Sequence, residues 1–299
     1  MNVVITGANG AVGQAILRCG ARPGNRPIGF VAAVRSERAV EQIRSKTAGV
    51  VRISYEDAST LDAAFRGAFA VIHLPGVLVE RPDSTYEQAN VESTRVVVES
   101  AKRAGVRKFV LVSATGADES SSNRYYRTKG QAELLVRASG LNYTVLRAPL
   151  LLGPSTAGGA ALKRNASRAK AKLIGGGRNL QQPLHVDDLA SAAVAAAAEE
   201  SVASNLTLDL VGPVSLPERE LVERAARLQG REIRIGSIPK SLLSCVLAIR
   251  HLRNLRRGLS RRVSLDTSNP DQCGLCSVRH RFLLDSPAEQ AARQQTRTL

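Results

Sequence analysis

The chain of 299 residues is 43% hydrophobic but only 3% aromatic, and it contains no tryptophan. This length suits one large α/β domain with a smaller attached lobe, while so few aromatic rings argue against a protein that stacks on nucleic-acid bases. The net charge of +16 would attract polyanions, but a general bias toward arginine accounts for it equally well, so we expect no specific nucleic-acid partner.

The N-terminus and the cysteines bear on location and metal binding. No stretch reaches the ~18 apolar residues of a membrane-spanning helix, and Met1 leads directly into a predicted strand without a leader peptide, so we expect a cytoplasmic protein. The four cysteines are too few and too scattered for a disulfide framework. Cys273 and Cys276, with His280 beyond them, have the spacing of half a zinc site. Because the second pair of cysteines is missing, we expect no metal site.

A glycine-rich turn follows the first predicted strand, Val3 to Ile5, and precedes an apolar helix. Its glycines have the spacing G-x-x-G-x-x-G. Gly7 would allow the tight turn, Gly10 would let backbone N–H groups approach a pyrophosphate, and Gly13 would let the helix lie close to the sheet. The phosphates would then bind at the helix N-terminus. This pattern predicts dinucleotide binding by Gly7, Ala8, Asn9, Gly10, Ala11, Val12 and Gly13.

A second strand is predicted from Phe30 to Val34, directly before Arg35. A site selective for NAD usually has Asp or Glu here, and the carboxylate accepts a hydrogen bond from the ribose 2′-hydroxyl. A guanidinium instead pairs with the 2′-phosphate of NADP through two hydrogen bonds. Arg35 therefore favours NADP(H) over NAD(H); the alternative is an ordinary solvated arginine.

Three further strands are predicted along the chain, from Val50 to Ile53, from Ala70 to Leu74 and from Phe109 to Val112. Asp57 or Ser59 would cap the helix after the first of these strands. A longer helix is predicted from Asn90 to Ala104. Pro75 and Gly76 leave a bare backbone where the cofactor ribose would pass. This alternation of strands and helices predicts an α/β fold with a parallel, doubly wound sheet.

Candidate catalytic residues follow the fifth strand. Ser113 ends that strand, and Tyr125 and Lys129 are four residues apart on one face of the next helix. Lowering the phenol pKa from about 10 by ~3 units takes ~4 kcal/mol, which a neighbouring ammonium and an oxidised nicotinamide can supply. Ser113 would hold a carbonyl or hydroxyl, Tyr125 would pass the proton, and Lys129 would hold the ribose and lower the tyrosine pKa. The alternative is an ordinary amphipathic surface helix.

These motifs resemble the short-chain dehydrogenases/reductases in their extended or atypical branch. The matching segments run from Thr6 to Gly13, from Val71 to Gly76, from Val110 to Ala114 and from Leu146 to Pro149, together with Tyr125 and Lys129. The segments from Gly175 to Gly177, from Gln182 to Ala190 and from Leu210 to Pro213 are similar to the second half of that branch. Residues 113–118 with 125–129 most resemble proteins similar to the nucleotide-binding accessory subunit of respiratory complex I.

The resemblance implies an NADP(H)-binding Rossmann domain with hydride transfer through Ser113, Tyr125 and Lys129. It adds further cofactor-binding candidates: Ser54, Tyr55, Leu74, Pro75, Gly76, Lys129 and Pro149. We therefore expect an oxidoreductase or epimerase that acts on a small carbonyl or hydroxyl compound. The alternative is a redox sensor, or an accessory or assembly subunit of a respiratory complex, that binds the cofactor without turnover.

We expect residues 1–153 to form the Rossmann domain, with 184–211 returning to it, and residues 154–183 and 212–285 to form a smaller substrate lobe. Basic residues crowd a predicted helix beyond Pro154, at Lys163, Arg164, Arg168, Lys170 and Lys172. They would line the mouth of the cleft and favour an anionic substrate, unless they form a solvated face. Asp187 and Asp188 resemble a paired-carboxylate site, but we interpret them as caps of the alanine-rich helix that follows.

The C-terminal part resembles the family least. An apolar run from Leu242 to Ile249 leads into arginines that share one side of a continuing helix as far as Arg262. The segment from Leu242 to Arg262 suits peripheral contact with the inner face of an anionic membrane, or with an acidic partner; the alternative is a lobe helix with a solvated end. Residues 286–299 are predicted to be a flexible tail. No pattern predicts an oligomeric state.

Overall fold

The computed structural model describes residues 1–20, 28–45, 47, 49–74, 76–198 and 205–239. These residues form two compact units: Met1–Leu162 with Gln181–Ser215, and Lys163–Leu180 with residues 216–239. Residues 154–162, 181–183 and 212–215, which we expected in the smaller lobe, belong to the first unit. Pro75, the segment from Leu242 to Arg262, the half zinc site and the tail lie outside the described residues. Within the described part, no helix is both long and apolar enough to cross a bilayer.

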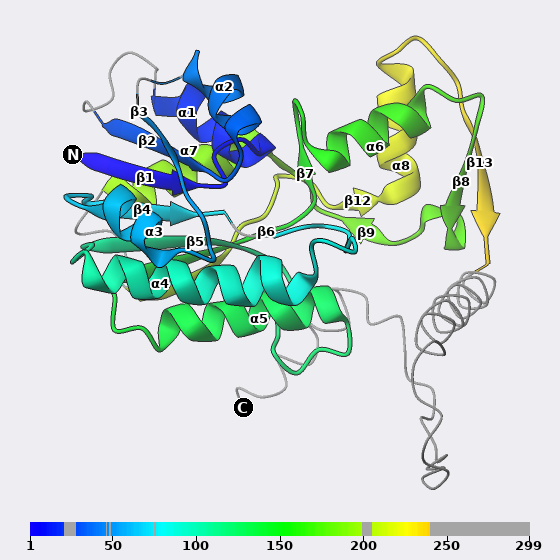
Figure 1. Ribbon diagram of the computed structural model, residues 1–299. Coiled ribbons are helices and arrows are strands. Elements are labelled where there is room, and N and C mark those ends of the chain that lie inside the picture. Colours follow the sequence, from blue (N-terminus) through cyan, green and yellow to red (C-terminus); the bar gives the residue numbers. More distant parts are fainter. Residues whose placement is uncertain (21–27, 46, 48, 75, 199–204, 240–299) are drawn as a thin grey trace, which may run out of the picture. The chain divides into compact units, whose positions relative to one another are not determined.

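The first unit is built on a parallel sheet of seven strands in the order β11-β6-β5-β4-β1-β2-β3 (Figure 1). The strands are β1 (Asn2–Thr6), β2 (Gly29–Val34), β3 (Gly49–Arg52), β4 (Ala70–His73), β5 (Lys108–Ala114), β6 (Tyr143–Ala148) and β11 (Leu206–Asp209). The strand order reverses between β1 and β4, and ligands of such sheets bind beyond the carboxyl ends of the strands at this reversal. The predicted doubly wound α/β fold is confirmed.

Six helices of the described chain cover the two faces of the sheet (Figure 1). The helices α1 (Ala11–Gly20), α2 (Glu37–Arg44) and α7 (Val186–Ala198) cover one face, and α3 (Ala58–Phe65), α4 (Ser93–Arg103) and α5 (Arg124–Arg137) cover the other. Successive strand residues alternate between the two cores: Val3 and Ile5 pack in the core with α1, whereas Val4 packs in the core with α3. Because both faces are covered, the strands are continuous apolar runs.

Side-chain caps fix where several helices begin. Asp57 accepts a hydrogen bond from the Ser59 N–H and caps α3, as the sequence predicted. Asn123 accepts from the Tyr125 N–H at 3.0 Å, so α5 begins at Arg124. The predicted helix from Asn90 to Ala104 is instead two segments, a π-helical turn at Glu87–Glu92 followed by α4.

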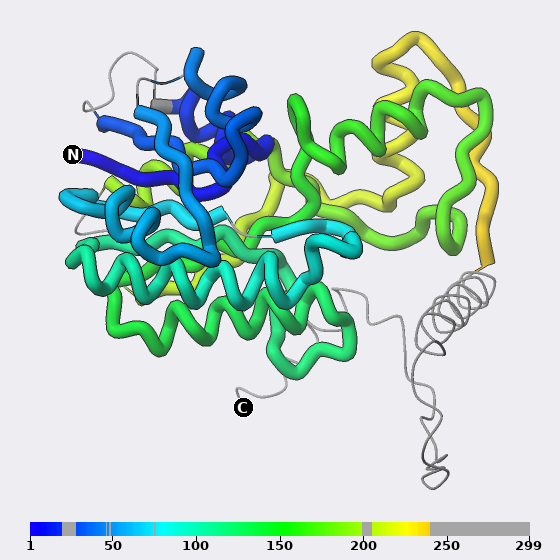
Figure 2. Tube along the Cα trace, in the orientation of Figure 1, coloured from blue at the N-terminus to red at the C-terminus, as the bar shows by residue number. Residues whose placement is uncertain are grey.

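The helices α1 and α7 lie side by side although they are far apart in the sequence (Figure 2). Asp187 and Asp188 fall in the first turn of α7, inside the helix rather than at its cap. Asp187 accepts a hydrogen bond from Arg18 of α1 at 3.1 Å, so it joins the two helices. Both carboxylates also lie at the end of the helix where negative charge is favoured.

Short elements complete the described chain. They are β7 (Leu151–Leu152), α6 (Ala157–Ala166), β8 (Lys170–Ile174), a 3₁₀ turn (Gly175–Gly177), β9 (Leu180–Gln181), β10 (Leu184–His185), β12 (Leu216–Pro217), α8 (Glu218–Arg227) and β13 (Arg234–Ile238). In the second unit β8 pairs with β13 in parallel. The predicted basic helix beyond Pro154 is therefore wrong in part, because α6 ends at Ala166 and Lys170 and Lys172 are exposed residues of β8.

Candidate active site

A cavity of about 360 Å³ lies in the first unit, beyond the carboxyl ends of β1, β4, β5 and β6. Its lining residues are Gly7, Gly10, Ala11, Val12, Gly13, Leu74, Gly76, Val77, Leu78, Val112, Ser113, Ala114, Tyr125, Lys129, Ala148, Pro149, Leu150, Leu151, Thr156, Ala157 and Gly158. This set combines most of the glycine-rich turn with the three predicted catalytic residues.

The glycine-rich turn forms one wall of the cavity. A Cβ atom on Gly7, whose φ is 74°, would lie 2.9 Å from the Leu74 carbonyl oxygen, and one on Gly13 would lie 2.5 Å from the Ala8 Cα. The protein itself therefore requires glycine at both positions. A Cβ on Gly10 would meet only the Gly7 oxygen, at 3.4 Å, so the missing side chain there leaves room on the cavity side.

The N-terminus of α1 opens onto this wall. The Gln14 N–H donates to the Gly10 carbonyl at 2.9 Å, which is the first bond of the helical ladder. The N–H groups that precede it in a helix have no intrahelical acceptor, and the positive end of the helix dipole adds to their attraction for an anion. Ala11, Val12 and Gly13 all line the cavity, so this end of α1 fits a pyrophosphate.

Ser113 lies near the end of β5 and is 5% exposed. Its Oγ atom is buried and has no hydrogen-bond partner among the described residues. A buried hydroxyl without a partner costs free energy, and such groups in native proteins call for an explanation such as a bound ligand. Since Ser113 also lines the cavity, its hydroxyl is available to a substrate oxygen.

Lys129 projects from α5 into the same cavity and is 5% exposed. Its Nζ atom donates to the Val112 carbonyl oxygen at 3.4 Å. Burial lowers the pKa of Lys129 to about 8, against the opposing attraction of the Glu133 carboxylate. Part of the Lys129 population is therefore neutral slightly above physiological pH, which is unusual for a lysine.

Tyr125 is half-buried, one turn before Lys129 on α5, and its ring lies edge-on against Tyr86 and Tyr126 at centroid distances of 5.6 and 5.4 Å. Burial raises the pKa of Tyr125 to about 12, and the two neighbouring tyrosines add to the rise. In the chain alone, the tyrosine pKa is thus raised and not lowered as the sequence suggested. The physical reason is that burial removes water from around the phenolate, and this desolvation disfavours the charged form.

Sequence reasoning missed Asn90, a buried residue of the π-helical turn. Its Nδ2 atom donates to Thr128 at 2.9 Å, while its Oδ1 atom is buried without a partner among the described residues. A Cβ on Gly76 would lie 2.7 Å from that oxygen and 3.1 Å from Lys129 Nζ, so the three residues meet at one point. In the sequence, Asn90 stands among other polar residues where a helix begins, and nothing there indicates these contacts.

Buried His73 at the end of β4 is a structural residue. It lies between the hydroxyls of Thr6, at 2.6 Å, and Thr94, at 3.2 Å, and therefore links β1 to α4. Burial and the Lys129 charge lower the pKa of His73 to about 3, so the imidazole is neutral at physiological pH.

The residues predicted for the adenosine end of the cofactor lie at the ends of β2 and β3. The Arg35 guanidinium lies over the Tyr55 ring, 5.6 Å from its centroid, and it is exposed with no ion pair to any described carboxylate. Ser54 precedes Tyr55, and its hydroxyl donates to Glu56 at 3.2 Å. Burial raises the pKa of Tyr55 while Arg35 opposes the rise. None of these three residues lines the cavity, nor do Ala8 and Asn9.

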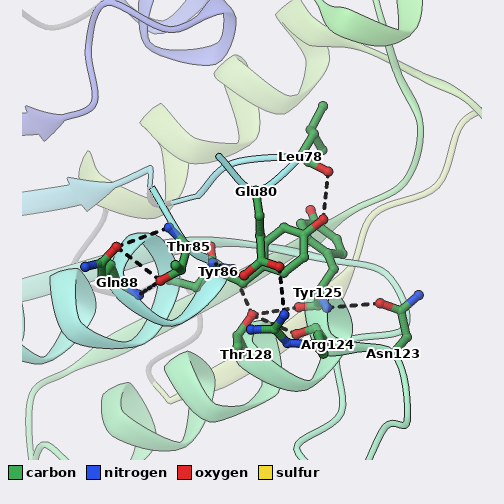
Figure 3. A network of polar contacts seen from close by, with 10 residues as sticks. Leu78, Glu80, Thr85, Tyr86, Gln88, Asn123, Arg124, Tyr125 and Thr128 are labelled. Carbon is green, nitrogen blue, oxygen red and sulfur yellow. Dashed lines mark hydrogen bonds and ion pairs between the residues drawn. The ribbon is translucent and has the colours of Figure 1, made fainter. Parts of the chain in front are cut away.

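Sequence reasoning also missed the segment 77–86, whose first two residues line the cavity. Figure 3 shows the polar contacts of this segment. The Tyr86 hydroxyl donates to the Leu78 carbonyl oxygen at 3.0 Å. Glu80 accepts from the Tyr86 N–H at 2.9 Å and pairs with Arg124 at 2.8 Å. These bonds tie the segment to the start of α5, where Tyr125 lies.

Comparisons with known proteins agree with this geometry. A family model described as NAD(P)H-binding matches residues 7–200. The chain is 28% identical to ceramide reductase of Caulobacter vibrioides over 237 residues, which cover 79% of this chain and 73% of the reductase. It is 29% identical over 173 residues to NADH dehydrogenase [ubiquinone] 1 alpha subcomplex subunit 9 of Arabidopsis thaliana, covering 56% of this chain and 42% of that subunit.

Solved structures show the same fold. The NADPH-dependent quinone oxidoreductase QOR2 of Escherichia coli, complexed with NADPH, superimposes with a TM-score of 0.65. The match covers 80% of this chain and 79% of that protein at 20% identity, so the likeness is one of fold.

Proposed function

The chain belongs to the NAD(P)H-binding family, and on that premise we propose that it is an NADP(H)-dependent oxidoreductase or epimerase acting on a carbonyl or hydroxyl compound. Reductases among its relatives support an enzyme. The observation that carries the proposal is the buried Ser113 hydroxyl, which has no hydrogen-bond partner in the described part of the chain. It lies in one cavity with Tyr125, Lys129 and the glycine-rich turn.

The chain's own residues fit the cofactor. The α1 N-terminus and Gly10 would hold the pyrophosphate, Lys129 would hold the nicotinamide ribose, and the exposed Arg35 would hold a 2′-phosphate. The remaining candidates, Ala8, Asn9, Ser54, Tyr55, Leu74, Gly76 and Pro149, would complete the cofactor contacts. When bound, the nicotinamide supplies the hydride for the carbonyl carbon.

Reduction suits the side chains best. Ser113 would donate a hydrogen bond to the substrate oxygen and hold it near Tyr125. A phenol with a pKa of about 12 keeps its proton at neutral pH, so Tyr125 can donate that proton as the C=O bond becomes C–O–H. Lys129, with a pKa of about 8, can return a proton from solvent. In the balanced reaction, a ketone, NADPH and one proton become an alcohol and NADP⁺.

The test compares wild type, Tyr125→Phe and a matched control, Tyr126→Phe, by NADPH absorbance with aldehydes, ketones, quinones and nucleotide sugars. Tyr126 packs against Tyr125 but does not line the cavity. We expect turnover to fall by ~10² to 10⁴ in Tyr125→Phe, with NADPH affinity retained, and to stay near wild type in the control. Equal turnover in wild type and Tyr125→Phe across all these compounds would refute the catalytic role.

A second candidate is a non-catalytic NADP(H)-binding sensor or an accessory subunit of a respiratory assembly. It is favoured by the similarity to the Arabidopsis subunit named above. This role requires tight NADPH binding by both wild type and Tyr125→Phe, with no turnover by either.

A further inference from the structure

We propose that the site takes substrates whose reacting carbonyl is attached to a bulky, uncharged, apolar body, and that residues 77–79 hold this body. The inference rests on the proposed function, because it names the substrate class of the same site. It also excludes sugar nucleotides and anionic compounds as preferred substrates.

The distribution of polar groups in the cavity supports this class. Among the described lining residues, polar side chains occur only at Ser113, Tyr125, Lys129 and Thr156. Thr156 is already engaged, since its hydroxyl donates to the Gly153 carbonyl at 2.9 Å and accepts from the Gly159 N–H at 3.0 Å. No carboxylate, guanidinium or side-chain amide belongs to this described lining. The three remaining groups are those assigned to the reacting oxygen and the ribose.

A polar substrate body would therefore find no further side chain in this lining to replace its hydrogen bonds to water. Each hydroxyl left unpaired in such a wall costs about 1 to 3 kcal/mol, whereas each buried methylene gains about 0.8 kcal/mol. Apart from the residues assigned to the cofactor, the large apolar side chains of the lining include Val77, Leu78, Leu150 and Leu151. These side chains favour an apolar substrate body over a polar one.

Residues 77–79 extend the apolar surface out of the cavity. Val77 and Leu78 line it, and Leu78 and Val79 are 63% and 72% exposed. Single exposed leucines are ordinary, but adjacent large apolar side chains beside a cavity mark a binding surface. A substrate longer than the cavity would cover them.

The polar contacts of segment 77–86 hold the backbone that carries these side chains (Figure 3). The Leu78 carbonyl is directed to the Tyr86 hydroxyl, and Glu80 is fixed by Arg124 and the Tyr86 N–H. Because Arg124 begins α5, the apolar surface is fixed relative to Tyr125 on the same helix. Because the backbone of this segment is already held in place, binding a hydrocarbon there avoids the entropy cost of ordering a loop.

The experiment measures kcat/KM with methyl ketones of increasing length, from acetone to a long-chain ketone, and with the same long ketone carrying a terminal carboxylate. We expect kcat/KM to rise about fourfold for each added methylene until the apolar surface is covered, and the carboxylate to cancel the gain. Leu78→Ser should flatten the dependence on length. Leu134→Ser, which alters an exposed leucine of α5 away from the cavity lining, should preserve it.

A binding measurement in Tyr125→Phe separates this inference from the proposed reaction. The same ketones are titrated against the complex of this variant with NADPH, and cofactor fluorescence reports occupancy. Tight binding of the long ketone with no turnover in wild type would support the substrate class and refute the catalytic proposal. Turnover or binding that favours short, carboxylated or sugar-nucleotide compounds would overturn the substrate class and leave the catalytic proposal standing.

Discussion

Arg147 and Glu133 form a buried ion pair in which the guanidinium donates two hydrogen bonds, from Nε to Oε1 at 2.9 Å and from Nη2 to Oε2 at 2.7 Å. Glu133 is fully buried, and Arg137 donates to the same carboxylate at 3.0 Å. The pair joins β6 to α5, the helix that carries Tyr125 and Lys129.

Removing the carboxylate should therefore destabilise the first unit strongly. Glu133→Ala leaves two guanidinium groups without their buried partner, and the loss expected for one broken buried pair is about 3 to 5 kcal/mol in urea unfolding. Asp62→Ala is the control, because Asp62 forms a similar forked pair with Arg103 whose side chains are 39% and 49% exposed. Its loss should be much smaller, because solvent screens an exposed pair. If both variants lost a similar free energy of unfolding, burial could not be the reason that the Arg147–Glu133 pair stabilises the unit.

Cofactor preference should depend on Arg35. Arg35→Glu replaces an exposed guanidinium with a carboxylate that repels a 2′-phosphate, so NADPH affinity should fall about 10- to 100-fold while NADH affinity changes little. Arg44→Glu makes the same charge change at an exposed position of α2 and serves as control. Calorimetric titration with NADPH and with NADH measures the two affinities. Equal affinities of wild type for both cofactors would contradict the prediction.

The two glycines at the start of α1 should respond differently to alanine. Gly13→Ala forces a methyl group to 2.5 Å from the Ala8 Cα, so we expect about 1 to 3 kcal/mol lower stability. Gly10→Ala meets only the Gly7 oxygen at 3.4 Å, so it should fold normally but bind NADPH at least about tenfold more weakly. Thermal unfolding and cofactor titration separate the two effects. Unchanged NADPH affinity in Gly10→Ala would disprove the close approach of the pyrophosphate.

The pKa of Lys129 should make stability depend on pH in an unusual direction. Because this pKa is about 8 in the folded chain and higher in the unfolded chain, unfolding takes up a proton between about pH 8 and pH 10. Stability of the wild type should therefore rise through this window relative to Lys129→Met, which cannot titrate. Urea unfolding of both proteins at several pH values measures the difference. A difference that stays constant across the window would show that Lys129 is not desolvated.

Much of the first unit could be predicted because its signals are local. Buried parallel strands are apolar runs, so the strands ending at Thr6, Val34, His73 and Ala114 were all expected within a residue or two. The glycine-rich turn was equally clear, since its steric demands come from a short stretch of chain. The cavity brings Ser113, Tyr125 and Lys129 together with this turn, although their roles remain predictions.

The parts that were missed depend on tertiary contacts. Asn90 and Tyr86 matter through what they touch in α5, and a single sequence gives no indication of those contacts. The raised pKa of Tyr125 depends on burial by neighbouring rings, which spacing alone cannot predict. At Lys170 and Lys172 a signal was available, because basic and apolar residues alternate there with the period of a strand.

The pairing of α1 with α7 has a consequence for synthesis on the ribosome. Arg18 and Asp187 are 169 residues apart in the chain, so at about 5 to 20 residues per second the partner of α1 is made roughly 8 to 34 seconds after α1 itself. Until then Ile16 and Leu17 lack the apolar side chains of α7 that share their core. The nascent chain therefore exposes part of this apolar face for many seconds before α7 covers it.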